Sequence, residues 1–64
     1  MKVYESYIVE TIENSVKNTV PFKSLKRATS LCELEKTACE QVTLFGIYNG
    51  SVEEIKTWKQ QNKE

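Results

Sequence analysis

The sequence predicts an α+β domain in which a small antiparallel sheet is packed against one long amphipathic helix. Three observations lead to this prediction: extended segments rich in β-branched and aromatic residues near the N-terminus, one stretch of helical periodicity, and another extended run after it. The expected order is β-β-α-β-α, with a strand as the alternative for the last element. Residues 1–64 are expected to form a single domain, whose core must be thin at this length.

The first two predicted strands form a hairpin. Residues 2–12, "KVYESYIVETI", favour a strand because β-branched and aromatic side chains crowd a helix but suit a pleated surface. The following "ENS" supplies turn-forming residues, and Val16, Val20 and Phe22 then lie on one side of an extended segment. Pro21 cannot donate a ladder hydrogen bond, so the second strand is expected to lie at a sheet edge or to end there.

A helical pattern begins at Leu25, directly after Ser24, a residue type that commonly caps helices. At ~100° per residue, the apolar residues as far as Val42 gather on one half of the helical wheel. They are Leu25, Ala28, Leu31, Cys32, Leu34, Ala38, Cys39 and Val42. Residues 42–48, "VTLFGIY", then favour a strand, in which Gly46 indicates a bulge or a close approach of the backbone.

The last element has two interpretations. The pair Asn49-Gly50 favours a tight hairpin, which makes residues 51–59 a fourth strand. Ser51 and Glu54 instead match a capping box, and apolar residues recur after them at helical spacing. We take the helix over residues 51–62 as the prediction, which gives a three-stranded sheet with one face and at least one edge open.

Both cysteines of the chain stand in "SLCELEKTAC", at positions 32 and 39. On one helix they are two turns and ~10 Å apart along the axis, too far for a disulfide. They share their face with apolar residues and are therefore expected to be buried thiols. The chain has no histidine, so neither a metal nor any other cofactor is expected.

Glu35 is the exception on the apolar face of the predicted helix. A carboxylate there is costly unless it is paired or lies at the rim of the face. One interpretation is that Glu35 lies at this rim. The other is that it meets a cation of a binding partner as a specificity contact.

The charges of the chain are unevenly distributed although their sum is zero. Between residues 14 and 32 the only charged residues are Lys17, Lys23, Lys26 and Arg27, and they surround the start of the predicted helix. These four residues form a candidate nucleic-acid contact, because backbone phosphates bind cations and helix N-termini. The alternative function is therefore a small DNA- or RNA-binding regulator.

The leading functional prediction is a non-enzymatic protein-binding domain. The chain lacks histidine and aspartate, and its two glycines form no phosphate-binding loop, so general acid-base, nucleophilic and nucleotide-dependent chemistry have few of the groups they need. An open sheet edge or face could bind another protein or a second copy of the chain. The predicted partner-binding residues are Lys23, Lys26, Arg27, Glu35, Tyr4 and Tyr7.

In class, a chain of this size and composition is similar to the small accessory proteins with which phages and other mobile elements occupy a host protein. This similarity of class rests on no motif. It implies inhibition or modulation of a host macromolecular machine by occlusion. No stretch reaches the roughly 18 apolar residues of a membrane span, and glutamates interrupt the N-terminal segment too early for a secretory signal. The expected location is therefore the cytoplasm.

Overall fold

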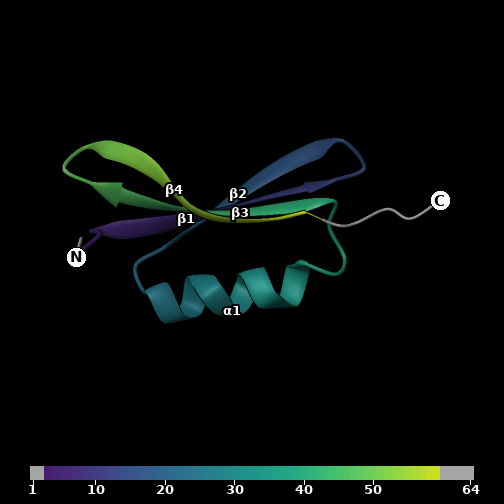
Figure 1. Ribbon diagram of the computed structural model, residues 1–64, viewed down its shortest axis with the longest axis horizontal. Coiled ribbons are helices and arrows are strands. Elements are labelled where there is room, and N and C mark those ends of the chain that lie inside the picture. Colours follow the sequence, from purple (N-terminus) through teal and green to yellow (C-terminus); the bar gives the residue numbers. More distant parts are fainter. Residues whose placement is uncertain (1–2, 60–64) are drawn as a thin grey trace.

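The computed structural model describes residues 3–59, which contain four strands and one helix (Figure 1). In chain order these are β1 (Ser6–Glu13), β2 (Val16–Phe22), α1 (Leu25–Glu35), β3 (Gln41–Tyr48) and β4 (Ser51–Lys59). The strands form one antiparallel sheet in the order β2-β1-β3-β4, and α1 lies across one face of it. The fold is therefore of the α+β kind that the sequence predicts.

The N-terminal hairpin is confirmed. A two-residue turn, Asn14-Ser15, joins β1 to β2, and both residues have positive φ angles, 53° and 66°. Positive φ at both positions is typical of the turns that match the twist of a hairpin. Pro21 lies opposite Ile8 in β2, which is an edge strand of the sheet, as the missing N–H of proline requires.

The prediction of a C-terminal helix is wrong, because residues 51–59 form strand β4. Asn49 and Gly50, with φ angles of 52° and 81°, make a second two-residue turn, and Ser51 pairs with Tyr48 directly after it. The order is thus β-β-α-β-β with four strands instead of three. Pairing with β3 satisfies the backbone groups of β4 that face β3 and brings Trp58 against the core, which outweighs a local capping signal. Residues 60–62 of the predicted helix lie outside the described residues.

The predicted helix is also too long, because α1 ends at Glu35 and does not continue to Val42. The N–H of Lys36 still bonds to the carbonyl of Cys32 at 2.9 Å, after which the chain turns. The N–H of Glu40 then bonds to the carbonyl of Ile12 at 2.8 Å, which fixes the start of β3 beside β1. Val42 therefore enters the core from the sheet.

The core lies between α1 and the sheet and is small. Its buried residues are Val9, Ala28, Cys32, Cys39, Val42 and Leu44. Half-buried Tyr7, Phe22, Leu31 and Trp58 pack around them. Both cysteines are buried free thiols, as predicted, although Cys39 follows the helix and is not part of it.

The close approach predicted at Gly46 is made by the ring of Tyr4. A Cβ atom at position 46 would lie 2.4–2.7 Å from three ring carbons of Tyr4. Glycine is therefore required at this position because the aromatic ring fills the space that a side chain would need. The same segment contains the one register shift between β3 and β4, at Leu44/Phe45.

Candidate protein-binding surface

Among residues 3–59, the single helix covers one face of the sheet and nothing helical lies over the other. Side chains alternate between the two faces of a strand, and Val9, Val42 and Leu44 point toward α1. Their neighbours Ile8 and Thr43 therefore point to the opposite side, which we call the open face.

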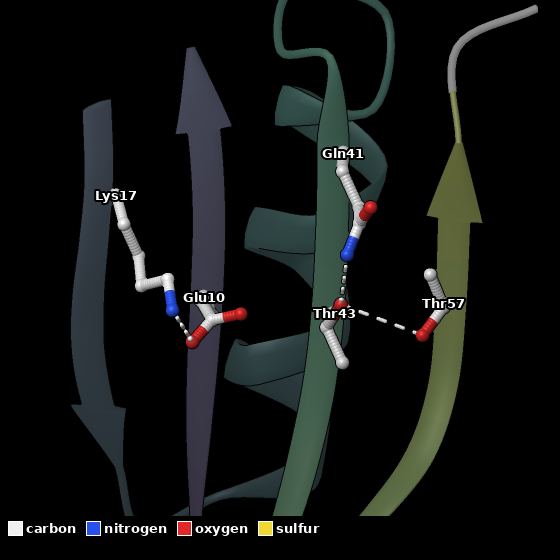
Figure 2. A network of polar contacts seen from close by, with 5 residues as sticks. All are labelled: Glu10, Lys17, Gln41, Thr43 and Thr57. Atoms are coloured by element: carbon white, nitrogen blue, oxygen red, sulfur yellow. Dashed lines mark hydrogen bonds and ion pairs between the residues drawn. The ribbon is translucent and has the colours of Figure 1, made fainter. Parts of the chain in front are cut away.

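One half of the open face is polar (Figure 2). The amide of Gln41 donates to the Thr43 hydroxyl at 3.3 Å, and the hydroxyl oxygens of Thr43 and Thr57 are 3.4 Å apart. Next to them, the Lys17 ammonium lies 3.7 Å from the Glu10 carboxylate. Thr43 is only 3% exposed although it belongs to the open face, because its polar neighbours cover it. The polar side chains of this half therefore bond to one another.

The other half of the open face is apolar. The cross-strand register places Ile8 beside both Pro21 and Phe45, and Ile47 beside Val52. We call these five residues the apolar patch. Ile8, Phe45 and Ile47 are half-buried, Pro21 is exposed, and Val52 is 59% exposed. The patch thus crosses all four strands of the sheet, and no helix or strand in the described part of the chain covers it.

A shallow hollow adjoins the apolar patch at the β2 side of the sheet. It has a volume of about 310 Å³ and is lined by Ser6, Pro21, Phe22 and Lys23. Two of the four lining residues are apolar, Pro21 and Phe22, and Lys23 is the charged residue among them. A partner side chain that is apolar, or apolar with an acidic end, fits this chemistry.

The structure brings only three of the four predicted basic residues to one end of the molecule. Lys23 precedes the helix, and Lys26 and Arg27 are exposed in its first turn, where the Ser24 side chain accepts the Arg27 N–H at 3.4 Å. Lys17 is near the far end of β2, ~17 Å from Phe22 at about 3.4 Å per residue. Because Lys17 also pairs with Glu10, the structure does not group it with the other three.

Tyr4 and Tyr7 lie on the helix side of the sheet and contact each other. Their ring centroids are 5.9 Å apart in an edge-to-face arrangement, and Tyr4 meets Tyr48 in the same way at 6.5 Å. The Tyr4 hydroxyl also donates to a carboxylate oxygen of Glu53 at 3.2 Å. These contacts order the end of the sheet near the N-terminus of α1. A partner-binding role for the two tyrosines stays a prediction.

Glu35 is the last residue of α1 and is half-buried. Its carboxylate oxygen Oε1 accepts the Cys39 thiol at 3.3 Å, and its backbone carbonyl accepts the N–H groups of Ala38 and Cys39 at 3.0 and 2.9 Å. Glu35 therefore holds together the turn that leaves the helix. This position agrees with the rim interpretation, and a contact from Glu35 to a partner stays a prediction.

We expect Glu35→Gln to change the free energy of unfolding by less than about 1 kcal/mol, since the glutamine oxygen can still accept the thiol of Cys39. Denaturant titration of the two proteins side by side measures this difference. A loss above about 2 kcal/mol would contradict a rim position and indicate a charge that the native state requires.

The structure offers no group of residues for metal chemistry within positions 3–59. No cluster of three or more His, Cys, Asp or Glu side chains there could hold a metal ion. Burial raises the pKa of the Cys32 thiol, and the negative charge of Glu33 raises it further. Burial, followed by the hydrogen bond to Glu35, likewise raises the pKa of Cys39. These thiols are therefore protonated at neutral pH and poorly nucleophilic.

Comparison of the chain with protein-family models, with curated proteins and with solved structures finds no significant match. Within residues 3–59 there is also no helix with the length and apolarity that a membrane crossing needs, since α1 has 11 residues.

Sequence reasoning predicted an open sheet face but not the residues that compose it. The signal was present in the alternation of Ile8 with Val9 and of Phe45 with Leu44. The alternation within each strand separates its two faces but does not indicate which face the helix will cover. The choice depends on the register between β1 and β3, which sets Val9 beside Leu44 and Ile8 beside Phe45.

Proposed function

We propose that this protein is a non-enzymatic protein-binding domain that docks through the open face of its sheet. The observation that supports this proposal is the one-sided cover of the sheet: within residues 3–59 no element lies over the apolar patch of Ile8, Pro21, Phe45, Ile47 and Val52. An apolar area with polar groups around it is typical of protein interfaces.

In this proposal the basic residues Lys23, Lys26 and Arg27 act beside the patch. Lys23 lines the hollow next to Pro21, and the other two are exposed in the following helical turn. Cations at the rim of an interface raise the rate of association with an acidic surface more than they raise the final affinity. We infer a partner that presents an apolar surface bordered by carboxylates.

The finer proposal concerns the class of partner. A domain with few groups for chemistry can act on a larger protein by covering a surface that this protein needs. A host macromolecular machine such as a polymerase or nuclease, inhibited by occlusion as phage or mobile-element accessory proteins do, would place this protein in the cytoplasm. This finer part rests on the size and composition of the chain alone.

The experiment is an affinity capture from a bacterial lysate at low and moderate salt, with and without nuclease, in which mass spectrometry identifies the retained proteins. We expect a stoichiometric protein to survive both treatments with the wild-type chain and to be lost with Val52→Glu. Leu34→Glu is the matched control, because Leu34 is 71% exposed on the helix, away from the open face. Equal retention by both variants would contradict docking at the patch.

The same experiment tests the alternative, a DNA- or RNA-binding regulator that uses Lys17, Lys23, Lys26 and Arg27. Affinity for phosphates falls linearly with salt on a log-log scale, in proportion to the phosphates contacted. Retention that disappears with nuclease, and with Lys26→Glu/Arg27→Glu but not with Val52→Glu, would replace the first proposal by this one.

A further inference from the structure

The two edges of the sheet differ in how well they are protected against pairing with another strand. The edge strand β4 carries four charged residues, Glu53, Glu54, Lys56 and Lys59, and the register shift leaves Ile55 without an opposite residue in β3. Charges and bulges of this kind are common protections of exposed edges. In β2, by contrast, Lys17 is the single charged residue, and it is engaged with Glu10.

Strand β2 is also the least covered strand of the sheet. Every residue from Val16 to Pro21 is exposed, and in Figure 1 the β1–β2 hairpin rises away from α1. Val16 is 56% exposed and Val20 is 39% exposed, both on the face that α1 covers elsewhere. Strand β2 therefore has one hydrogen-bonded neighbour, β1, while side chains on both of its faces are in contact with water.

The position of Pro21 in β2 shows which residues of this strand direct their backbone N–H and C=O groups outward, away from β1. In an antiparallel strand, residues alternate between those that bond to the neighbouring strand and those that bond outward. Pro21 lacks an N–H and is accommodated at an outward position opposite Ile8. By the same alternation Lys17 and Thr19 also point outward, each with an N–H and a C=O toward solvent.

We propose that β2 pairs antiparallel with β2 of a second copy of this chain, around a two-fold axis at Asn18. In this register Lys17 of one copy is opposite Thr19 of the other, so all outward N–H groups of the strand find carbonyls. Pro21 falls beyond the paired segment. This surface is separate from the apolar patch, so the proposal does not depend on the proposed function.

The side chains of β2 are compatible with the same register. Val16 lies opposite Val20 of the second copy, which pairs the two exposed valines twice on one face. The two Lys17 side chains are not directly opposite each other, and each ammonium lies 3.7 Å from a carboxylate oxygen of its own Glu10. The product is a closed two-fold dimer with one continuous sheet, whose remaining edges are the protected β4 strands.

The test combines the oligomeric state with a register-specific crosslink. Sedimentation of the wild-type chain over a range of concentrations is expected to show a monomer–dimer equilibrium. Thr19→Pro removes an outward N–H while leaving the bonds to β1, and is expected to weaken dimerisation by about 10- to 100-fold. Thr19→Val is the control and should dimerise like the wild type.

Asn18→Cys introduces the only exposed thiol, because both native cysteines are buried. Directly opposite residues of a non-hydrogen-bonded pair have Cα atoms about 4.5 Å apart, within disulfide reach. Oxidised glutathione should therefore convert this variant rapidly to a covalent dimer. Thr19→Cys is the matched control, since its two copies lie about 8–9 Å apart in the proposed register, too far for a disulfide.

Three results would overturn the proposal: a wild-type chain that stays monomeric at ~1 mM, equal crosslinking of the two cysteine variants, or an unchanged dimer in Thr19→Pro. Circular dichroism checks that Thr19→Pro is folded. If it is not, the comparison of Asn18→Cys with Thr19→Cys decides. Capture of a strand from a different protein at β2, without self-association, would also count against a second copy as the occupant.

Discussion

Replacing Gly46 with alanine is expected to destabilise the protein by about 2 kcal/mol, in the range typical of overpacked cores. The added Cβ would lie 2.4–2.7 Å from the Tyr4 ring, closer than carbon atoms can approach, so the ring must leave its place. Moving Tyr4 also removes its edge-to-face contacts with Tyr7 and Tyr48 and its hydrogen bond to Glu53. Denaturant unfolding of the two proteins measures the difference.

A double-mutant cycle isolates the cause of this loss. In a Tyr4→Ala background the clash is absent, so Gly46→Ala is expected to be neutral or slightly stabilising, because alanine restricts the unfolded chain more than glycine does. The coupling free energy between positions 4 and 46 should then account for nearly all of the destabilisation that Gly46→Ala causes in the wild-type background. An equal loss in both backgrounds would show that the backbone at position 46, and not the Tyr4 ring, requires glycine.

The elements that the sequence predicted correctly are those whose signals are local and unopposed. The hairpin around Asn14-Ser15, the edge position of β2 and the N-cap at Ser24 each depend on a few neighbouring residues. The C-terminal segment carries two opposed local signals, a turn at Asn49-Gly50 and a capping box after it. The turn prevailed, because the hairpin that it forms pairs β4 with β3 along its length, whereas the capping box stabilises only the first turn of a helix.

The length of the helix was overestimated for a related reason. The apolar stripe of the helical wheel included Leu34, which is 71% exposed, and Val42, which belongs to β3. A helix that lies across a sheet needs apolar residues only where it touches the strands, and here Ala28 and Cys32 are its buried residues. Small residues at these positions let the helix approach the sheet closely.

The candidate surface was predictable in kind but not in composition. An uncovered sheet face follows from a chain that has one long amphipathic segment for its whole sheet. The particular residues follow from the register, and the placement of Tyr4 follows from Gly46, which is 42 positions away along the chain. The separation of Lys17 from Lys23 likewise required the direction of β2, which turns a sequence cluster into two distant sites.

Above pH ~8.5, the protein is expected to become less stable because of its two thiols. Desolvation by burial raises the pKa of Cys32 and Cys39 in the folded state, and Glu33 and Glu35 respectively add to this effect. Unfolding returns each pKa to its ordinary range of about 8.5. The unfolded chain then binds fewer protons than the folded one, so the free energy of unfolding falls as pH rises.

Each protonated thiol thus makes its full contribution to stability below about pH 8. This contribution is lost as the pH rises from the pKa of the thiol in the unfolded chain to its pKa in the folded protein. The slope is at most about 1.4 kcal/mol per pH unit for each thiol. Thermal unfolding between pH 7.5 and about 9.5 measures this slope.

The control is the variant Cys32→Ala/Cys39→Ala, which lacks both thiols. Its absolute stability is lower because two core side chains become smaller, but its pH profile in this window should be flat. The comparison must therefore use slopes and not melting temperatures at a single pH. If this variant lost stability with pH as steeply as the wild type, groups other than the thiols would be responsible for the loss of stability at alkaline pH. The buried thiols would then be part of the core without contributing to its pH dependence.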